Sequence, residues 1–277
     1  MSEPLFDEVG ARKLEAIYLT ADVIVQRERA LTAMMLESGE RVVDLGCGPG
    51  LLALEILNRI GDTGALEGID QSGSMVGLAE RRCAAWANAR FEVGDVIALP
   101  YDDQSFDAGV CTQVYEYAED VDLALRELYR VLRPGGRAVI VDTDWESCVW
   151  HSSDPQRMRQ VIEAWDTHCA HPHLPRTLAR RLRDAGFAVE RCEVVPLVNL
   201  GWDPQTYSVG MLPVLGRHAA PALGEAVTRA WAADLRELGA RGEYFFSLNR
   251  YLFCARRREP SMQKQCVFHG SCARGVG

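Results

Sequence analysis

The chain has 277 residues, 48% of them hydrophobic and 25% charged, which is the composition of a globular protein with one large domain or two small ones. Its net charge of −9 argues against binding along nucleic-acid phosphates, which requires clustered lysine and arginine side chains. No apolar run approaches the ~20 residues of a membrane span, so we expect a protein that acts on neither nucleic acid nor membranes.

The cysteines and the amino-terminal segment bear on the cellular compartment. No basic segment followed by an apolar run opens the chain, so we expect no secretory signal. The nine cysteines are odd in number, and most lie within apolar segments. This pattern is typical of reduced thiols, and we therefore expect a cytoplasmic protein. The sequence leaves open whether the chain forms a homodimer.

The first predicted element is a helix over residues 12–38, where apolar side chains recur at mostly three- and four-residue spacing. Short apolar strands then alternate with helices. We predict strands at residues 41–45, 65–69, 89–93, 106–111 and 137–142, and helices at residues 51–60, 75–87 and 120–132. Such alternation is typical of an α/β fold, in which parallel strands are joined by right-handed crossover helices on both faces of the sheet.

The pattern changes after residue 142. Residues 143–175 are rich in tryptophan and histidine and are predicted to mix loop and helix. Beyond them we predict a helix at residues 176–185, a strand at 187–196, a helix-rich stretch at 200–243 that includes a helix over 221–238, and a last strand at 245–255. The polar segment that follows is predicted to fray.

A glycine-rich turn is the first motif that points to chemistry. An apolar strand carrying Asp44 leads through Gly46, Gly48 and Gly50 directly into a helix. Glycines let the backbone adopt positive φ and approach a ligand closely, and the helix N-terminus offers unpaired N–H groups. The spacing G-x-G-x-G differs from the G-x-G-x-x-G of pyrophosphate-binding turns. The turn therefore predicts a nucleotide-like cofactor at the carboxyl ends of the strands.

Two acidic residues follow the next two predicted strands. Asp70 is positioned to accept hydrogen bonds from ribose hydroxyls, a role that nicotinamide enzymes also use, so it indicates a ribose without naming the cofactor. Asp95 either binds an exocyclic amine such as that of adenine or caps the next turn. Residues 99–107 and 128–137 are each compatible with a mere turn and strand. Taken together, in this order after Asp70 and Asp95, the two segments form a far more specific pattern.

Taken in this order, the motifs of residues 41–142 resemble those of the class I S-adenosylmethionine-dependent methyltransferases, within the ubiquinone/menaquinone C-methyltransferase-like group. The resemblance implies a Rossmann-like, mostly parallel sheet of seven strands with an antiparallel last strand, helices on both faces, and helical insertions that form a substrate cap. It also implies one domain over residues 1–258, with a flexible tail at 259–277. The implied parts are a helical lid at 1–40, a cofactor-binding core at 41–142, substrate-shaping insertions at 143–243 and the last strand at 244–258.

The resemblance further implies how the cofactor S-adenosylmethionine is held. Asp44 would lie below the methionine amino group, and Gly46 and Gly48 would pack against the carboxypropyl portion. Asp70 would bind the ribose, and Met75 would cover one face of the adenine.

Four more residues complete the implied cofactor-binding set. The carboxylate of Asp95 and the backbone of Val96 would contact the adenine amine. Gln113 would stand near the methionine moiety, and Tyr18 would close over the cofactor or pack as a core aromatic residue.

The acceptor side of the reaction is less explicit in the sequence. Methyl transfer to a small-molecule acceptor, at O, N or C, needs in-line positioning and exclusion of water, and an acid–base pair is optional. The catalytic candidates are Tyr115, Glu116, Asp144 and His168, which follow the fourth and fifth strands or lie in the inserted segment.

Other functions remain open at this stage. Cys266, His269 and Cys272 form a C-x-x-H-x-x-C pattern that would suit metalloid (arsenite) or thiol methylation, or is an incidental tail. We assign no metal site. A cofactor-binding protein without catalysis and, less well matched, a nicotinamide dehydrogenase are the remaining alternatives.

Overall fold

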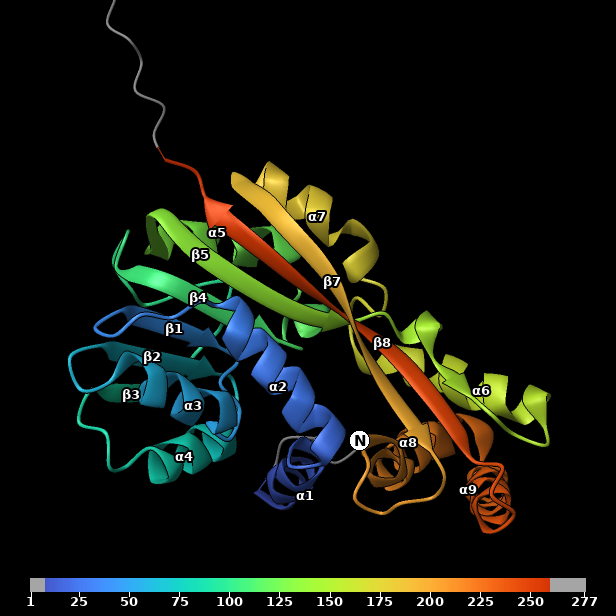
Figure 1. The fold of residues 1–277 in the computed structure, drawn as a ribbon. Helices are drawn as coiled ribbons and strands as arrows, with labels where there is room; N and C mark the ends of the chain where they lie inside the picture. Colours follow the sequence, from blue (N-terminus) through green and yellow to red (C-terminus); the bar gives the residue numbers. More distant parts are fainter. Residues whose placement is uncertain (1–7, 260–277) are drawn as a thin grey trace, which may run out of the picture.

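The computed structural model describes residues 8–259. A single twisted sheet with strand order β3-β2-β1-β4-β5-β8-β6 forms its centre, and β7 pairs with β8 (Figure 1). The strands are β1 (Arg41–Leu45), β2 (Ala65–Asp70), β3 (Ala89–Val93), β4 (Phe106–Thr112), β5 (Leu132–Thr143), β6 (Val149–Trp150), β7 (Phe187–Leu200) and β8 (Phe245–Arg257).

Helices precede, connect and follow these strands. They are α1 (Glu8–Tyr18), α2 (Ala21–Ala33), α3 (Leu51–Ile60), α4 (Gly73–Arg82), α5 (Val121–Val131), α6 (Pro155–Trp165), α7 (Pro175–Asp184), α8 (Tyr207–Leu223) and α9 (Glu225–Ala240), with short 3-10 turns at 115–117, 145–147 and 166–168. None of the helices in the described part of the chain is long and apolar enough to cross a bilayer.

Strand direction confirms the predicted α/β class. Strands β1 to β5 pair in parallel, whereas β8 runs antiparallel to both β5 and β7. The sheet has one strand more than the seven expected, because Val149–Trp150 adds a two-residue strand beside β8. The reversed strand is β8, with 13 residues, and it lies between β5 and the 14-residue β7, to which it is joined through α8 and α9.

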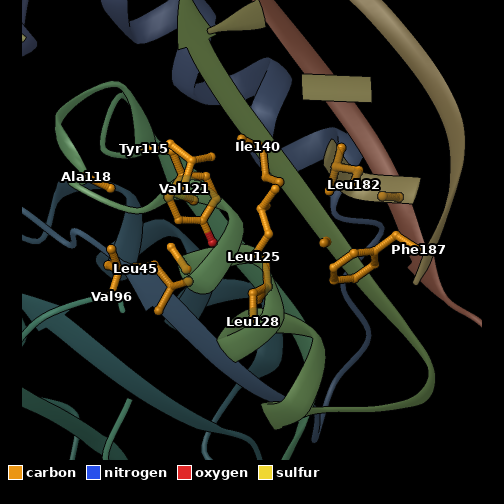
Figure 2. Packing of buried hydrophobic residues seen from close by; sticks show 14 of the residues in the cluster. Leu45, Val96, Tyr115, Ala118, Val121, Leu125, Leu128, Ile140, Leu182 and Phe187 are labelled. Atoms are coloured by element: carbon orange, nitrogen blue, oxygen red, sulfur yellow. The ribbon is translucent and has the colours of Figure 1, made fainter. Parts of the chain in front are cut away.

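Helices cover both faces of the parallel strands. On one face, α2 and α3 bury their apolar side chains against β1, β2, β4 and β5. On the other face, α5 and α7 pack against the same sheet through Leu125, Leu128 and Leu182, beside Phe187 of β7 (Figure 2). A strand buried from two sides is mostly apolar along its length, which is why β1 and β4 are short runs of mainly apolar residues.

A third buried cluster lies beyond the parallel strands. Strands β7 and β8 extend past the parallel strands. There β7 ends beside α8 and β8 begins beside α9, and α6 lies on the other side of β8 (Figure 1). Residues from α1, α6, α8, α9 and β8 form this cluster, which includes Trp145, Trp165 and Trp231. The division of the chain into lid, core and insertions stays a prediction, and the tail falls outside the described residues.

Two of the predicted helices are wrong, because each is interrupted in the structure. The helix expected over 12–38 is interrupted, because Thr20 adopts extended backbone and its hydroxyl donates to the Ile17 carbonyl oxygen at 2.7 Å. The helix expected over 221–238 is two helices, because Gly224 has a φ of 87° and ends α8. Strand β7 also continues to Leu200, beyond the predicted end at residue 196. Its pairing with β8 shifts register between Val189 and Arg191 and then persists to the end of the strand.

Candidate functional site

The glycine turn has the backbone geometry that its sequence predicts. Gly46 and Gly48 have φ values of 68° and 52°, a region that L side chains rarely adopt. A Cβ atom on Gly46 would lie 2.1 Å from Cγ2 of Val114, whereas a Cβ on Gly48 would meet no atom within 4 Å. Gly46 thus allows the turn to lie close to Val114, and Gly48 faces open space where a ligand fits.

Asp70 joins this turn to the end of β2. Its Oδ2 accepts a hydrogen bond from the Gly48 backbone N–H at 2.9 Å, and its Oδ1 accepts one from the Ser72 N–H at 2.8 Å. Burial raises the pKa of Asp70, and these two bonds oppose that shift. The carboxylate is therefore fixed in orientation before any ligand arrives.

A cavity of about 540 Å³ connects the turn with the helices of the third cluster. This volume is in the range of small-molecule sites. Its walls from the sheet side include Gly46, Gly48, Asp70, Met75, Gly94, Val96 and Gln113. Its walls from the other elements include Leu14, Tyr18, Gln26, Tyr117, Trp145, Trp165, Tyr207, Met211 and Arg250. The cavity thus has one wall of backbone turns and one wall of aromatic and apolar side chains.

Seven of the nine predicted cofactor residues line this cavity: Tyr18, Gly46, Gly48, Asp70, Met75, Val96 and Gln113. Asp44 and Asp95 do not line it. The Oδ1 of Asp95 accepts a hydrogen bond from the Ile97 N–H at 3.1 Å, which is the turn-capping alternative. The structure therefore brings most of the predicted set together, while the cofactor contacts themselves stay predictions.

Asp44 lies buried next to the turn with an unsatisfied carboxylate. Its side chain is 1% exposed, and its Oδ2 has no hydrogen-bond partner among the described residues. Burial, and secondarily the charge of Asp70, raise the pKa of Asp44 to about 7. A buried carboxylate without a partner is costly, so this position favours a cationic ligand group beside it.

Gln113 has a conformation that the sequence did not reveal. It is one of three non-glycine residues in the described part of the chain with positive φ, at 57°. Its backbone N–H donates to the Val141 carbonyl oxygen at 2.6 Å, and its Nε2 donates to Thr143 Oγ1 at 3.0 Å. Such strain concentrates at functional sites, where the surrounding structure holds it in place.

Two of the four catalytic candidates occupy structural positions. The Tyr115 side chain is fully buried and packs beside Ala118 and Val121 in the cluster under α5 (Figure 2). The carboxylate of Asp144 accepts hydrogen bonds from Arg176 at 2.8 and 3.0 Å. Neither residue lines the cavity, so their positions argue against direct contact with a ligand.

Glu116 and His168 lie behind the aromatic wall. Burial raises the pKa of Glu116 to about 7, and its Oε2 accepts from the Thr143 N–H at 3.3 Å. His168 stacks on Trp165 at 3.9 Å between ring centroids, and burial lowers its pKa to about 4. Neither side chain lines the cavity. A catalytic role for these two stays a prediction that would require them to act through Trp145 or Trp165.

Sequence reasoning missed several polar residues of the cavity wall, among them Gln26 and Arg250. Arg250 lies in the middle of β8 and is 1% exposed. The signal available in the sequence was an arginine in the interior of a mostly apolar strand, the one predicted over residues 245–255. Gln26 lies on α2 among apolar residues and accepts a hydrogen bond from Arg250 Nη1.

The cysteines bear on the metalloid alternative. No group of three histidine, cysteine, aspartate or glutamate side chains within residues 8–259 is arranged to hold a metal ion. Cys266, His269 and Cys272 lie outside the described residues.

Comparison with known proteins identifies what the chain resembles. A family model described as a methyltransferase domain matches residues 36–186. An uncharacterized 37.1 kDa protein in transposon TN4556 of Streptomyces fradiae is 32% identical over 249 residues, which cover 87% of this chain and 71% of that protein. The 2-phytyl-1,4-naphthoquinone methyltransferase of Nostoc punctiforme is 36% identical over 126 residues, covering 43% of this chain and 53% of its own length. The match thus spans about half of that quinone methyltransferase.

Solved structures share the fold. Geranyl diphosphate methyltransferase in complex with S-adenosylmethionine has a TM-score of 0.54 and 20% sequence identity, and the match covers 84% of each chain. At this identity the likeness concerns the arrangement of strands and helices alone.

Proposed function

We infer the reaction from the family, because the chain belongs to the class I S-adenosylmethionine-dependent methyltransferases. We propose that it transfers a methyl group to a small, partly apolar and aromatic molecule by in-line displacement. Positioning of the two reactants and exclusion of water supply most of the catalysis in this proposal.

One observation carries the proposal: the glycine turn and the aromatic wall share a single cavity. A donor held at Gly48 and Asp70 and an acceptor held between Trp145, Trp165 and Tyr207 would meet within about 540 Å³. The names of two relatives also favour an aromatic acceptor: the 2-phytyl-1,4-naphthoquinone methyltransferase described above, and the demethylmenaquinone methyltransferase of Staphylococcus aureus, which is 33% identical over 119 residues. We propose that residues 143–243 shape the acceptor site, since Trp145, Trp165, Tyr207 and Met211 all come from them.

The residues present fit the cofactor. S-adenosylmethionine supplies, when bound, a methyl group activated by the positive charge of its sulfonium. In our proposal Asp70 orients the ribose hydroxyls, Met75 covers the adenine and the buried carboxylate of Asp44 attracts the methionine ammonium group. Tyr18 and the tryptophans exclude water from the reacting atoms, which strengthens every electrostatic interaction in the cavity.

Two measurements test this function. Calorimetry with S-adenosylhomocysteine should show binding, and NADH should not bind in its place. Incubation with S-adenosylmethionine that carries a trideuterated methyl group should then give a product 17 mass units heavier than an aromatic acceptor from a panel of phenols, quinols and amines (gain of CD₃, loss of H). Binding of S-adenosylhomocysteine without methylation of any panel member would favour the cofactor-binding protein without catalysis.

The metalloid alternative has its own test. Replacement of Cys266 and Cys272 by serine should leave methylation of an aromatic acceptor unchanged. Loss of all methyl transfer in the double variant, with native thermal stability, would instead support chemistry at these thiols.

We expect Asp70→Ala to weaken S-adenosylhomocysteine binding by at least tenfold. Each lost hydrogen bond to a charged group costs roughly 1.5–3 kcal/mol, and the variant also frees the Gly48 and Ser72 N–H groups from their acceptor. Calorimetry measures the change, and Asp62→Ala, an exposed carboxylate in the turn after α3, is the matched control. Native affinity in Asp70→Ala would contradict the placement of the ribose.

A further inference from the structure

Arg250 is a buried charge in the wall of the proposed acceptor site. It lies in the middle of β8, paired with Thr143 of β5 and with Val195 of β7. The residue is 1% exposed, yet it lines the cavity together with Gln26 and Tyr207. An arginine side chain is almost never fully buried unless a partner compensates its charge.

The partners of Arg250 in the protein are neutral. Its Nη1 donates to Oε1 of Gln26, and its guanidinium lies 4.8 Å from the ring centroid of Tyr207. Its Nε is buried and has no acceptor in the described part of the chain. Among residues 8–259, no carboxylate lies within the 4.0 Å of an ion pair with this guanidinium. The guanidinium also makes a side-chain hydrogen bond with Tyr207, so every partner that Arg250 has in the described part of the chain is neutral, and its charge is left without an ion pair.

The nearest acidic side chains do not provide a dedicated counter-ion. Glu116 is close enough for Arg250 to lower its pKa, but burial has the larger effect and raises that pKa to about 7. The Oε2 of Glu116 is directed to the Thr143 N–H. Burial also raises the pKa of Asp142 well above its usual value. Burial thus favours the neutral form of both carboxyl groups, and neither lies within ion-pair distance of Arg250.

We propose that Arg250 binds a carboxylate of the methyl acceptor, so that the substrate class is a small aromatic carboxylic acid. This inference rests on the proposed function. The planar fork of a guanidinium matches the two oxygens of a carboxylate, and the rings of Trp145, Trp165 and Tyr207 provide the apolar surface for the rest of the molecule. Thr143, the strand neighbour of Arg250, accepts a hydrogen bond from Gln113, so the anion would lie close to the junction of the two parts of the cavity.

The test compares acids with their neutral isosteres. Protein saturated with S-adenosylhomocysteine is titrated with 2-naphthoate and benzoate and with the corresponding primary amides, by calorimetry and by quenching of tryptophan fluorescence. We expect the acids to bind at least tenfold more tightly than the amides. Arg250→Gln should remove this preference and leave the affinity for S-adenosylhomocysteine within about twofold. Arg256→Gln, which removes a half-exposed arginine from the same strand, should keep the preference.

A second variant tests the charge without removing the arginine. Gln26→Glu places a carboxylate on Nη1 of Arg250 and should reduce the acid-over-amide preference to less than threefold, even if Arg250→Gln fails to fold. Equal binding of acids and amides in the native protein, or no binding of either acid at millimolar concentration, would overturn the inference. So would an Arg250→Gln variant that loses S-adenosylhomocysteine but keeps naphthoate, because Arg250 would then hold the carboxylate of the cofactor. If the native protein does not bind S-adenosylhomocysteine, the proposed function itself fails.

Discussion

Replacement of Asp44 by asparagine is expected to weaken S-adenosylhomocysteine binding about 100-fold at pH 8. The Asp44 carboxylate is buried and its Oδ2 has no partner in the described part of the chain, so a ligand ammonium group would be its main source of compensation. Asp44 does not line the cavity, so its carboxylate would act on the ammonium group through its charge. Removal of one partner of a buried charge pair costs roughly 3–5 kcal/mol.

The same residue predicts how binding depends on pH. Burial raises the pKa of Asp44 to about 7, so the protein without ligand holds this carboxyl protonated below that pH. A cationic ligand binds the ionised form, and affinity should therefore rise about tenfold per pH unit up to pH 7 and level off above it. The stability of the ligand-free fold depends on pH in the opposite direction. Because the pKa of this carboxyl group is raised in the folded protein, the free energy of unfolding falls as the pH rises from about 4 to about 7.

Binding calorimetry from pH 5.5 to pH 8 checks the effect of Asp44→Asn and the pH dependence of the affinity. Asp44→Asn should give an affinity that varies little over this range, and buffers of different ionisation enthalpy should report proton release in the native protein alone. Asp102→Asn, at an exposed carboxylate on the turn before β4, serves as the matched control. A native pH profile in Asp44→Asn would contradict the placement of the ammonium group.

The cofactor half of the site was predictable because its chemistry is local in sequence. Gly46, Gly48 and Asp70 are tied together by turns at the ends of adjacent parallel strands, and strand order alone brings them to one edge of the sheet. The periodicity of apolar residues likewise predicted most strands. It could not locate the breaks at Thr20 and Gly224, since apolar residues continue with helical spacing across both.

The acceptor half was not predictable because it depends on long-range packing. Arg250 and Gln26 are 224 residues apart in the chain and meet only when β8 is inserted beside β5 and α2 covers it. Tyr115 is the converse case, a residue whose place in the sequence does not reveal the direction of its side chain. It follows β4 in sequence, where a cavity residue is expected, but the 3-10 turn at 115–117 directs its ring into the core under α5 (Figure 2).

Two alanine substitutions in the glycine turn should separate stability from binding. Gly46→Ala places a Cβ 2.1 Å from Cγ2 of Val114, a β-branched side chain that cannot rotate freely, at a φ of 68°. Overpacking and the left-handed backbone together cost about 3 kcal/mol. For a domain of this size such a loss lowers Tm by roughly 6–12 °C.

Gly48→Ala is the matched partner of that variant, two residues further along the same turn. Its Cβ would meet no protein atom within 4 Å, so backbone strain alone, about 1–2 kcal/mol, acts on stability. The added methyl group would instead occupy space in the cavity, and S-adenosylhomocysteine binding should fall at least tenfold. Differential scanning fluorimetry and calorimetry on both variants measure the two effects. Native affinity in Gly48→Ala would show that the cofactor does not approach this backbone, and a native Tm in Gly46→Ala would show that Val114 moves aside at little cost.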